Sequence, residues 1–72
     1  MNRTRQTFSM ESRNLLRDNG IPFRPSAGDS MEIPGDRVEP AALRRLGFRL
    51  GHGTGKIRYL IYYHGQFCGV VL

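Results

Sequence analysis

The chain has 72 residues, with 11 lysines and arginines against 6 aspartates and glutamates and a formal net charge of +5. This length allows one domain and excludes the large multi-layer enzyme folds. The composition, 39% hydrophobic and 24% charged, is typical of a folded protein rather than a disordered polyelectrolyte. A domain this small buries only about 60% of its unfolded surface. It would therefore gain stability from a partner, and a homodimer is one such option.

The first twenty residues predict a basic arm followed by a helix. Residues 1–8 are polar and positively charged, and we expect them to form a flexible arm. Ser9 is a favourable N-cap for a helix over 9–19, because its hydroxyl can accept a hydrogen bond from an unpaired amide of the first turn. Gly20 suits the end of this helix, since glycine readily adopts the left-handed conformation found there.

The middle of the chain predicts two short strands and a second helix. The prolines in 21–25 favour an extended edge strand, because a proline nitrogen cannot donate a hydrogen bond to a sheet. A turn over 26–30 precedes a second strand at 31–33. Pro40 suits the first position of a helix, the residues after it are good helix formers, and Gly47 marks the end.

The C-terminal part of the chain predicts a β-hairpin. A strand begins at 48–50, and a glycine-rich loop, 51–55, follows it. Two runs rich in β-branched and aromatic residues, 56–63 and 66–72, are joined by His64-Gly65, which suits a two-residue hairpin turn.

This turn predicts the register of the hairpin, with Tyr62 opposite Phe67 and Ile61 opposite Cys68. The expected core face carries Ile57, Tyr59, Ile61, Cys68, Val70 and Leu72. The other face carries Arg58, Leu60, Tyr62, Phe67 and Val71. Together the elements predict a single small α+β domain over 9–72, in which two short helices pack on a small, mostly antiparallel sheet with a C-terminal β-hairpin.

Positive charge is concentrated in one segment. Residues 41–58 carry a net charge of +5, residues 1–18 carry +2 and residues 19–40 carry −2. The candidate binding residues are the five cations of this segment and two aromatic residues of the hairpin: Arg44, Arg45, Arg49, Lys56, Arg58, Tyr62 and Phe67. Arginines bind phosphates, and aromatic rings exposed on a sheet stack with unpaired bases. If a helix covers the two rings instead, they serve only packing.

These patterns favour a binding module over an enzyme. We expect a small non-enzymatic module that acts on nucleic acid, or on a nucleic-acid-bound complex, through the basic segment 41–58. The alternative is a phage or mobile-element type inhibitor that binds a host protein complex, since arginine and aromatic side chains also dominate protein interfaces. Neither a cofactor nor a metal is expected, because His52 and His64 have no acidic or thiol partner at ligand spacing.

The cysteine content and hydropathy indicate a compartment. Cys68 is the only cysteine, which excludes an internal disulfide and favours a reducing environment. No apolar run approaches the roughly 20 residues of a membrane span. We therefore expect a soluble, cytoplasmic protein without a membrane partner.

The glycine-rich loop only partly matches a nucleotide-binding loop. Gly51–Lys56 lacks the leading glycine of that motif, since Leu50 occupies its position, and Ile57 replaces the serine or threonine that would hold magnesium. We therefore expect a plain strand connection, with anion binding by its amides as the alternative.

The Gly-Asp-Ser-Met-Glu segment at 28–32, followed by Gly35-Asp36, resembles the self-cleaving peptidases related to phage repressors. The resemblance implies that Ser30 is a nucleophile and that Lys56, the only lysine, is its base. However, the lysine follows the serine too closely for that family, and the chain has no room for its β-rich domain. The other interpretation of 28–30 is an ordinary turn.

A short helix, Gly47-Phe48, a strand, a glycine and an aromatic hairpin over 41–72 resemble the HicA toxins, small RNases with a fold like that of double-stranded-RNA-binding domains. A small RNase-like toxin is therefore a second alternative. Ile57 stands where that family has its catalytic histidine, so the resemblance implies a basic RNA-facing surface rather than the activity.

Overall fold

The computed structural model describes the backbone of residues 5–72 and the side chains from residue 9 onward. Its first element is helix α1 (Arg5–Asp18), which begins before the predicted helix over 9–19 and includes part of the predicted arm. The rest of that arm, residues 1–4, lies outside the described residues. The helix ends before Gly20, as predicted, and the φ of this glycine is +71°.

Ser9 and Arg13 connect α1 to the turn before the second strand. The prediction that Ser9 caps the helix is wrong, because Ser9 lies inside α1 and its hydroxyl donates to the carbonyl oxygen of Asp29 at 3.0 Å. One turn later, Arg13 donates to the carbonyl oxygens of Asp29 and Ser30 at 3.3 and 3.4 Å. These side chains satisfy backbone acceptors of the turn over 26–30 and so hold it against the helix.

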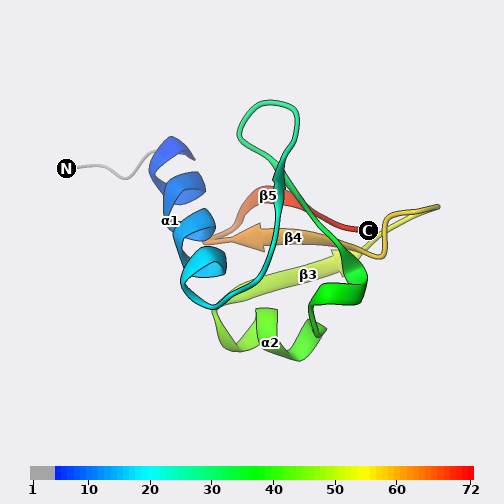
Figure 1. Cartoon of the computed structure of the whole chain (residues 1–72). Helices are drawn as coiled ribbons and strands as arrows, with labels where there is room; N and C mark the ends of the chain where they lie inside the picture. Colours follow the sequence, from blue (N-terminus) through cyan, green and yellow to red (C-terminus); the bar gives the residue numbers. More distant parts are fainter. Residues whose placement is uncertain (1–4) are drawn as a thin grey trace.

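A five-stranded sheet forms the centre of the fold, with strand order β1-β2-β5-β4-β3. Figure 1 labels β3, β4 and β5, which lie side by side. The strands are β1 (Arg24–Pro25), β2 (Met31–Ile33), β3 (Phe48–His52), β4 (Tyr59–Tyr63) and β5 (Gln66–Val71). The β1–β2, β3–β4 and β4–β5 pairs are antiparallel, whereas β2 and β5 run parallel. The fold is therefore α+β, as predicted, with a mixed sheet.

The C-terminal hairpin has the predicted turn but a different register beyond its first pairs. Tyr62 lies opposite Phe67, as expected, whereas Ile61 lies opposite Gly69 instead of Cys68. A β-bulge produces this shift, since Cys68 is one extra residue on β5. The predicted pairing of Ile61 with Cys68 is therefore wrong.

The bulge also changes which valine faces the core. Val71, rather than the predicted Val70, shares the buried face with Ile61. Gly69 lies where β5 approaches β2 most closely, because a Cβ at this position would collide with the backbone oxygen of Met31. The glycine thus permits the parallel pairing of β2 with β5.

The second helix, α2 (Pro40–Arg45), follows a short 3-10 helix, η1 (Gly35–Arg37). It begins at the predicted proline, and the chain reverses at Gly47, whose φ is +104°. Leu43 is its buried side chain and joins Leu16 of α1 in one core. The core consists of Leu16, Ile21, Met31, Ile33, Leu43, Phe48, Ile61, Cys68 and Val71.

Because side chains of both helices enter this core, both helices cover the same face of the sheet. The opposite face is left without a helix in the described part of the chain. In that same part, no helix is both long and apolar enough to cross a membrane.

Candidate nucleic-acid interface

The sheet face opposite the core carries an arginine and two aromatic rings in one row. Strand pairing places Arg49 of β3 opposite Tyr62 of β4, and Tyr62 opposite Phe67 of β5. Directly paired residues point to the same side of a sheet, so these three side chains are neighbours. The rings of Tyr62 and Phe67 meet edge to face, with centroids 5.9 Å apart.

This row is accessible to a ligand. Phe67 is 40% exposed, Arg49 is exposed and Tyr62 is half-buried. Gly51, beside them in β3, lies next to the Tyr62 ring, and a Cβ there would make an ordinary contact of 3.4 Å with the ring carbon Cε2. The alternative interpretation of Tyr62 and Phe67 is that a helix covers the two rings and that they serve only packing. Within residues 5–72, both helices pack on the other face instead.

The next row of the same face is apolar and ends in an ion pair. Leu60 and Val70 lie opposite each other and are half-buried. Beyond Val70 lies Glu32 of β2, and its carboxylate accepts a hydrogen bond from Arg24 of β1 at 3.1 Å. We call the exposed row and its apolar neighbours the open face: Arg49, Tyr62, Phe67, Leu60 and Val70.

The other predicted binding residues lie at the two ends of β3. Arg44 and Arg45 are exposed in the last turn of α2, just before β3 begins, near the end of the strand that carries Arg49. Lys56 is exposed in the loop that follows the opposite end of β3. Arg58 lies in the same loop and lines a pocket beside the core, so it does not join Tyr62 and Phe67.

The glycine-rich segment forms a closed turn between β3 and β4. Gly51 belongs to β3, and the amide of Gly53 donates to the carbonyl oxygen of Arg58 at 3.2 Å. The amide of Ile57 donates to the carbonyl oxygen of Thr54 at 3.0 Å. These amides bond within the loop, as in a plain strand connection, and a strand follows where a phosphate-binding loop would open a helix.

Ser30 and Lys56 do not form the pair that the peptidase resemblance implies. Ser30 directly precedes β2, and its hydroxyl donates to the carbonyl oxygen of Ala27 within the turn. Lys56 lies beyond the other end of the parallel β2–β5 pair, since the amide of Arg58 bonds to the carbonyl oxygen of Val71. A nucleophile without a neighbouring base lacks the means of activation, so Ser30 is a turn residue.

Cys68 is a packing residue rather than a reactive thiol. Its side chain is buried at the bulge, and its thiol donates to the carbonyl oxygen of Ile61 at 3.5 Å. Burial raises the pKa of the Cys68 thiol to about 12, because the apolar surroundings disfavour the thiolate. No cluster of three or more His, Cys, Asp or Glu side chains that could hold a metal occurs among the described residues.

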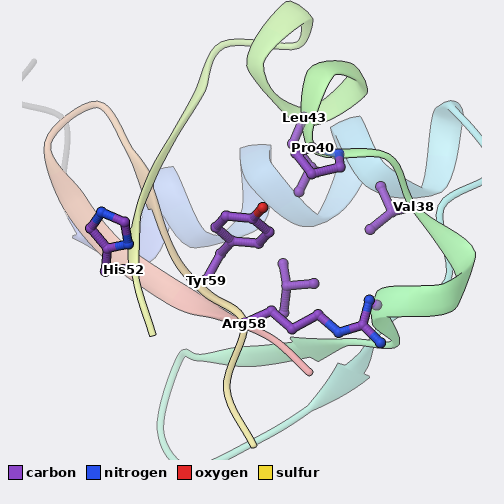
Figure 2. A pocket seen from close by; sticks show the side chains of 8 residues that line it. Val38, Pro40, Leu43, His52, Arg58 and Tyr59 are labelled. Carbon is purple, nitrogen blue, oxygen red and sulfur yellow. The ribbon is translucent and has the colours of Figure 1, made fainter. Parts of the chain in front are cut away.

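Sequence reasoning missed a pocket of about 370 Å³ between η1, α2 and the sheet. Figure 2 shows its lining side chains. They come from segments far apart in the sequence: Gly35, Val38, Pro40, Leu43, His52, Arg58, Tyr59 and Val71. Only the packing of α2 on the sheet brings them together, so no local pattern predicts the pocket.

Comparisons of the chain with protein-family models, curated proteins and solved structures found no match. The function is therefore inferred from the residues and their geometry. The open face and the pocket offer different chemistry, since one exposes aromatic rings beside an arginine and the other encloses aliphatic surface beside Arg58.

Proposed function

We propose that this protein is a small non-enzymatic binding module that holds single-stranded nucleic acid against its open face. The observation that carries the proposal is the accessible row formed by Arg49, Tyr62 and Phe67. Unpaired bases stack on exposed aromatic rings, while arginines bind the phosphates that connect them. The net charge of +5 favours the approach of a polyanion.

The positions of the arginines suggest a path for the strand. With bases on Tyr62 and Phe67, the phosphates would lie toward Arg49. Arg44 and Arg45 lie at the same end of β3 but in the helix on the opposite face, so the strand would reach them by passing around the edge that β3 forms. Three such contacts predict a slope of about −2 in a plot of log affinity against log salt concentration, because each phosphate contact with a single strand contributes about −0.7. Lys56, at the other end of β3, would contribute little.

Fluorescence anisotropy with labelled oligonucleotides of about 12 bases tests this proposal, because such a length spans the usual site of a small sheet platform. We expect binding to both DNA and RNA single strands, weakening steeply as salt rises. Phe67→Ala should weaken binding by about 1–3 kcal/mol, which is the usual contribution of one stacked base. Arg44→Gln and Arg45→Gln should each reduce the salt slope by about 0.7.

Matched controls separate the open face from general charge and hydrophobicity. Met10 is 60% exposed on α1, away from the sheet, so Met10→Ala controls for the loss of an exposed apolar side chain. Arg37→Gln, in η1, controls for the loss of one positive charge. Neither control should change the stacking of bases on Tyr62 and Phe67. If Phe67→Ala binds as tightly as Met10→Ala, or if no single strand binds at low salt, the proposal is wrong.

A protein partner is the second candidate, and the apolar row of Leu60 and Val70 beside the arginine favours it. An inhibitor that docks on a host protein complex would bury these side chains together with Phe67. Its affinity should depend only weakly on salt, whereas phosphate binding depends on it steeply. Cross-linking in a host extract, with Phe67→Ala as the comparison, would identify such a partner.

A further inference from the structure

The pocket between η1, α2 and the sheet has an apolar interior with one cationic side chain. Val38, Pro40, Leu43 and Val71 supply aliphatic surface, and Tyr59 adds an aromatic ring. Figure 2 shows the Arg58 side chain extending toward Val38, while the Tyr59 ring points toward Pro40. Such a combination, mostly apolar with a few placed polar groups, is typical of small-molecule sites.

The backbone around Arg58 is fixed on both sides. Its amide donates to the carbonyl oxygen of Val71 at 2.8 Å, and its carbonyl oxygen accepts from the amide of Gly53 at 3.2 Å. The side chain runs along the backbone of Gly35, since a Cβ at Gly35 would lie 3.0 Å from both Cδ and Cζ of Arg58. A Cβ at Gly35 would also collide with the backbone oxygen of Leu72, so the absence of a side chain there makes room both for Leu72 and for the Arg58 side chain.

No acidic side chain among the described residues pairs with Arg58, although the backbone oxygen of Leu72 lies beside the same face of Gly35 as the guanidinium. No aspartate or glutamate lines the pocket, and Arg58 forms no salt bridge within residues 9–72. A guanidinium next to apolar surface is well placed to bind a carboxylate through two parallel hydrogen bonds. A single cation matches the charge of one carboxylate rather than that of a phosphate dianion.

We propose that this pocket binds a small organic carboxylate with an apolar body. The carboxylate lies on the guanidinium of Arg58, and the apolar body lies among Val38, Leu43 and Tyr59. His52 and the Tyr59 hydroxyl offer further hydrogen bonds to polar groups of the ligand. This site is independent of the open face, because the two lie on opposite sides of the sheet.

Hydrocinnamate, an aromatic ring joined to a carboxylate by two methylenes, is a suitable probe. Its neutral amide has the same shape without the charge. In titrations followed by ¹H–¹⁵N correlation spectra, hydrocinnamate should shift the amides of Val38, Leu43 and Tyr59, with a dissociation constant of about 1 mM for a ligand of this size. The amide should bind about tenfold more weakly, because it lacks the charge-assisted hydrogen bonds.

Two variants assign the effect to Arg58. This side chain is exposed at the pocket mouth, so Arg58→Gln should leave the dispersed spectrum intact while lowering the affinity for hydrocinnamate to that for the amide. Arg49→Gln removes the same charge from the open face and should leave the preference for the carboxylate unchanged. Inorganic phosphate should bind more weakly than hydrocinnamate, since it gains nothing from the apolar walls.

Three results would overturn the proposal. The first is the absence of shifts around the pocket at millimolar hydrocinnamate. The second is an equal response to the acid and the amide, or a preference that persists in Arg58→Gln. The third is phosphate binding as tight as that of hydrocinnamate, which would indicate a simple anion site. None of these results depends on whether the open face binds nucleic acid.

Discussion

Truncating Leu43 or Leu16 to alanine should have different costs, although both side chains are fully buried. A buried Leu→Ala change costs about 2–5 kcal/mol, depending on whether the space left behind stays empty. Leu43 lines the pocket beside α2, so water can enter the space that its side chain leaves. Leu16 lies in the core between α1 and the sheet. We therefore expect about 2–3 kcal/mol for Leu43→Ala and about 3–5 kcal/mol for Leu16→Ala.

Urea unfolding followed by far-ultraviolet circular dichroism measures both costs. A chain of this length has a free energy of unfolding of about 4–11 kcal/mol, at roughly 0.05–0.15 kcal/mol per residue. Leu43→Ala should therefore shift the midpoint and still fold. Leu16→Ala should shift the midpoint further, and it should come close to unfolding if the stability lies at the lower end of this range. An equal or larger loss for Leu43→Ala, with unchanged slopes of the unfolding curves, would refute the argument that the pocket relieves the cavity.

Three further outcomes follow from single contacts. The Cys68 thiol should not react with a disulfide reagent until the protein is unfolded. Burial raises the pKa of this thiol from 9.0 to about 12, so the stability that the protonated thiol contributes is complete below pH 9 and is lost as the pH rises toward 12. Between these pH values, the stability of the protein relative to Cys68→Ala should fall by about 1.4 kcal/mol per pH unit. Chemical denaturation of both proteins at each pH measures this difference. Gly69→Ala should separate β2 from β5 because its Cβ collides with Met31, so the dispersed amide spectrum should be lost. Arg13→Gln should cost about 1 kcal/mol and increase hydrogen exchange at the turn before Met31, since it removes hydrogen bonds to that turn.

The local signals in the sequence predicted the elements well. Pro40 and Gly47 bound the second helix because they act on their own backbone, one by fixing φ and the other by tolerating a positive φ. The two-residue turn at His64-Gly65 set the first pairs of the hairpin for the same reason. The prediction that Ser9 caps the first helix was wrong, because the hydroxyl of a serine inside a helix can instead donate to a distant carbonyl oxygen, here that of Asp29.

Features that depend on distant segments could not be predicted. The bulge at Cys68 lies next to Gly69, where β2 approaches β5 closely, and β2 and β5 are far apart in the sequence. The same distinction between local and distant effects applies to the predicted binding residues. Arg49, Tyr62 and Phe67 came together because strand pairing and alternation place them there. Arg58 does not lie with these three residues as predicted, because it belongs to the loop before β4 and its side chain lies beside Gly35.

The position of β5 in the middle of the sheet has a consequence for folding on the ribosome. β5 is the final strand of the sequence, yet it joins the β1–β2 pair to the β3–β4 pair. Until β5 has left the exit tunnel, the N-terminal pair has no neighbouring strand and only the local β3–β4 contacts can form. Formation of the whole sheet must therefore wait until β5 is available. A truncated variant that ends before Gln66 would leave two separate strand pairs with unpaired edges prone to aggregation.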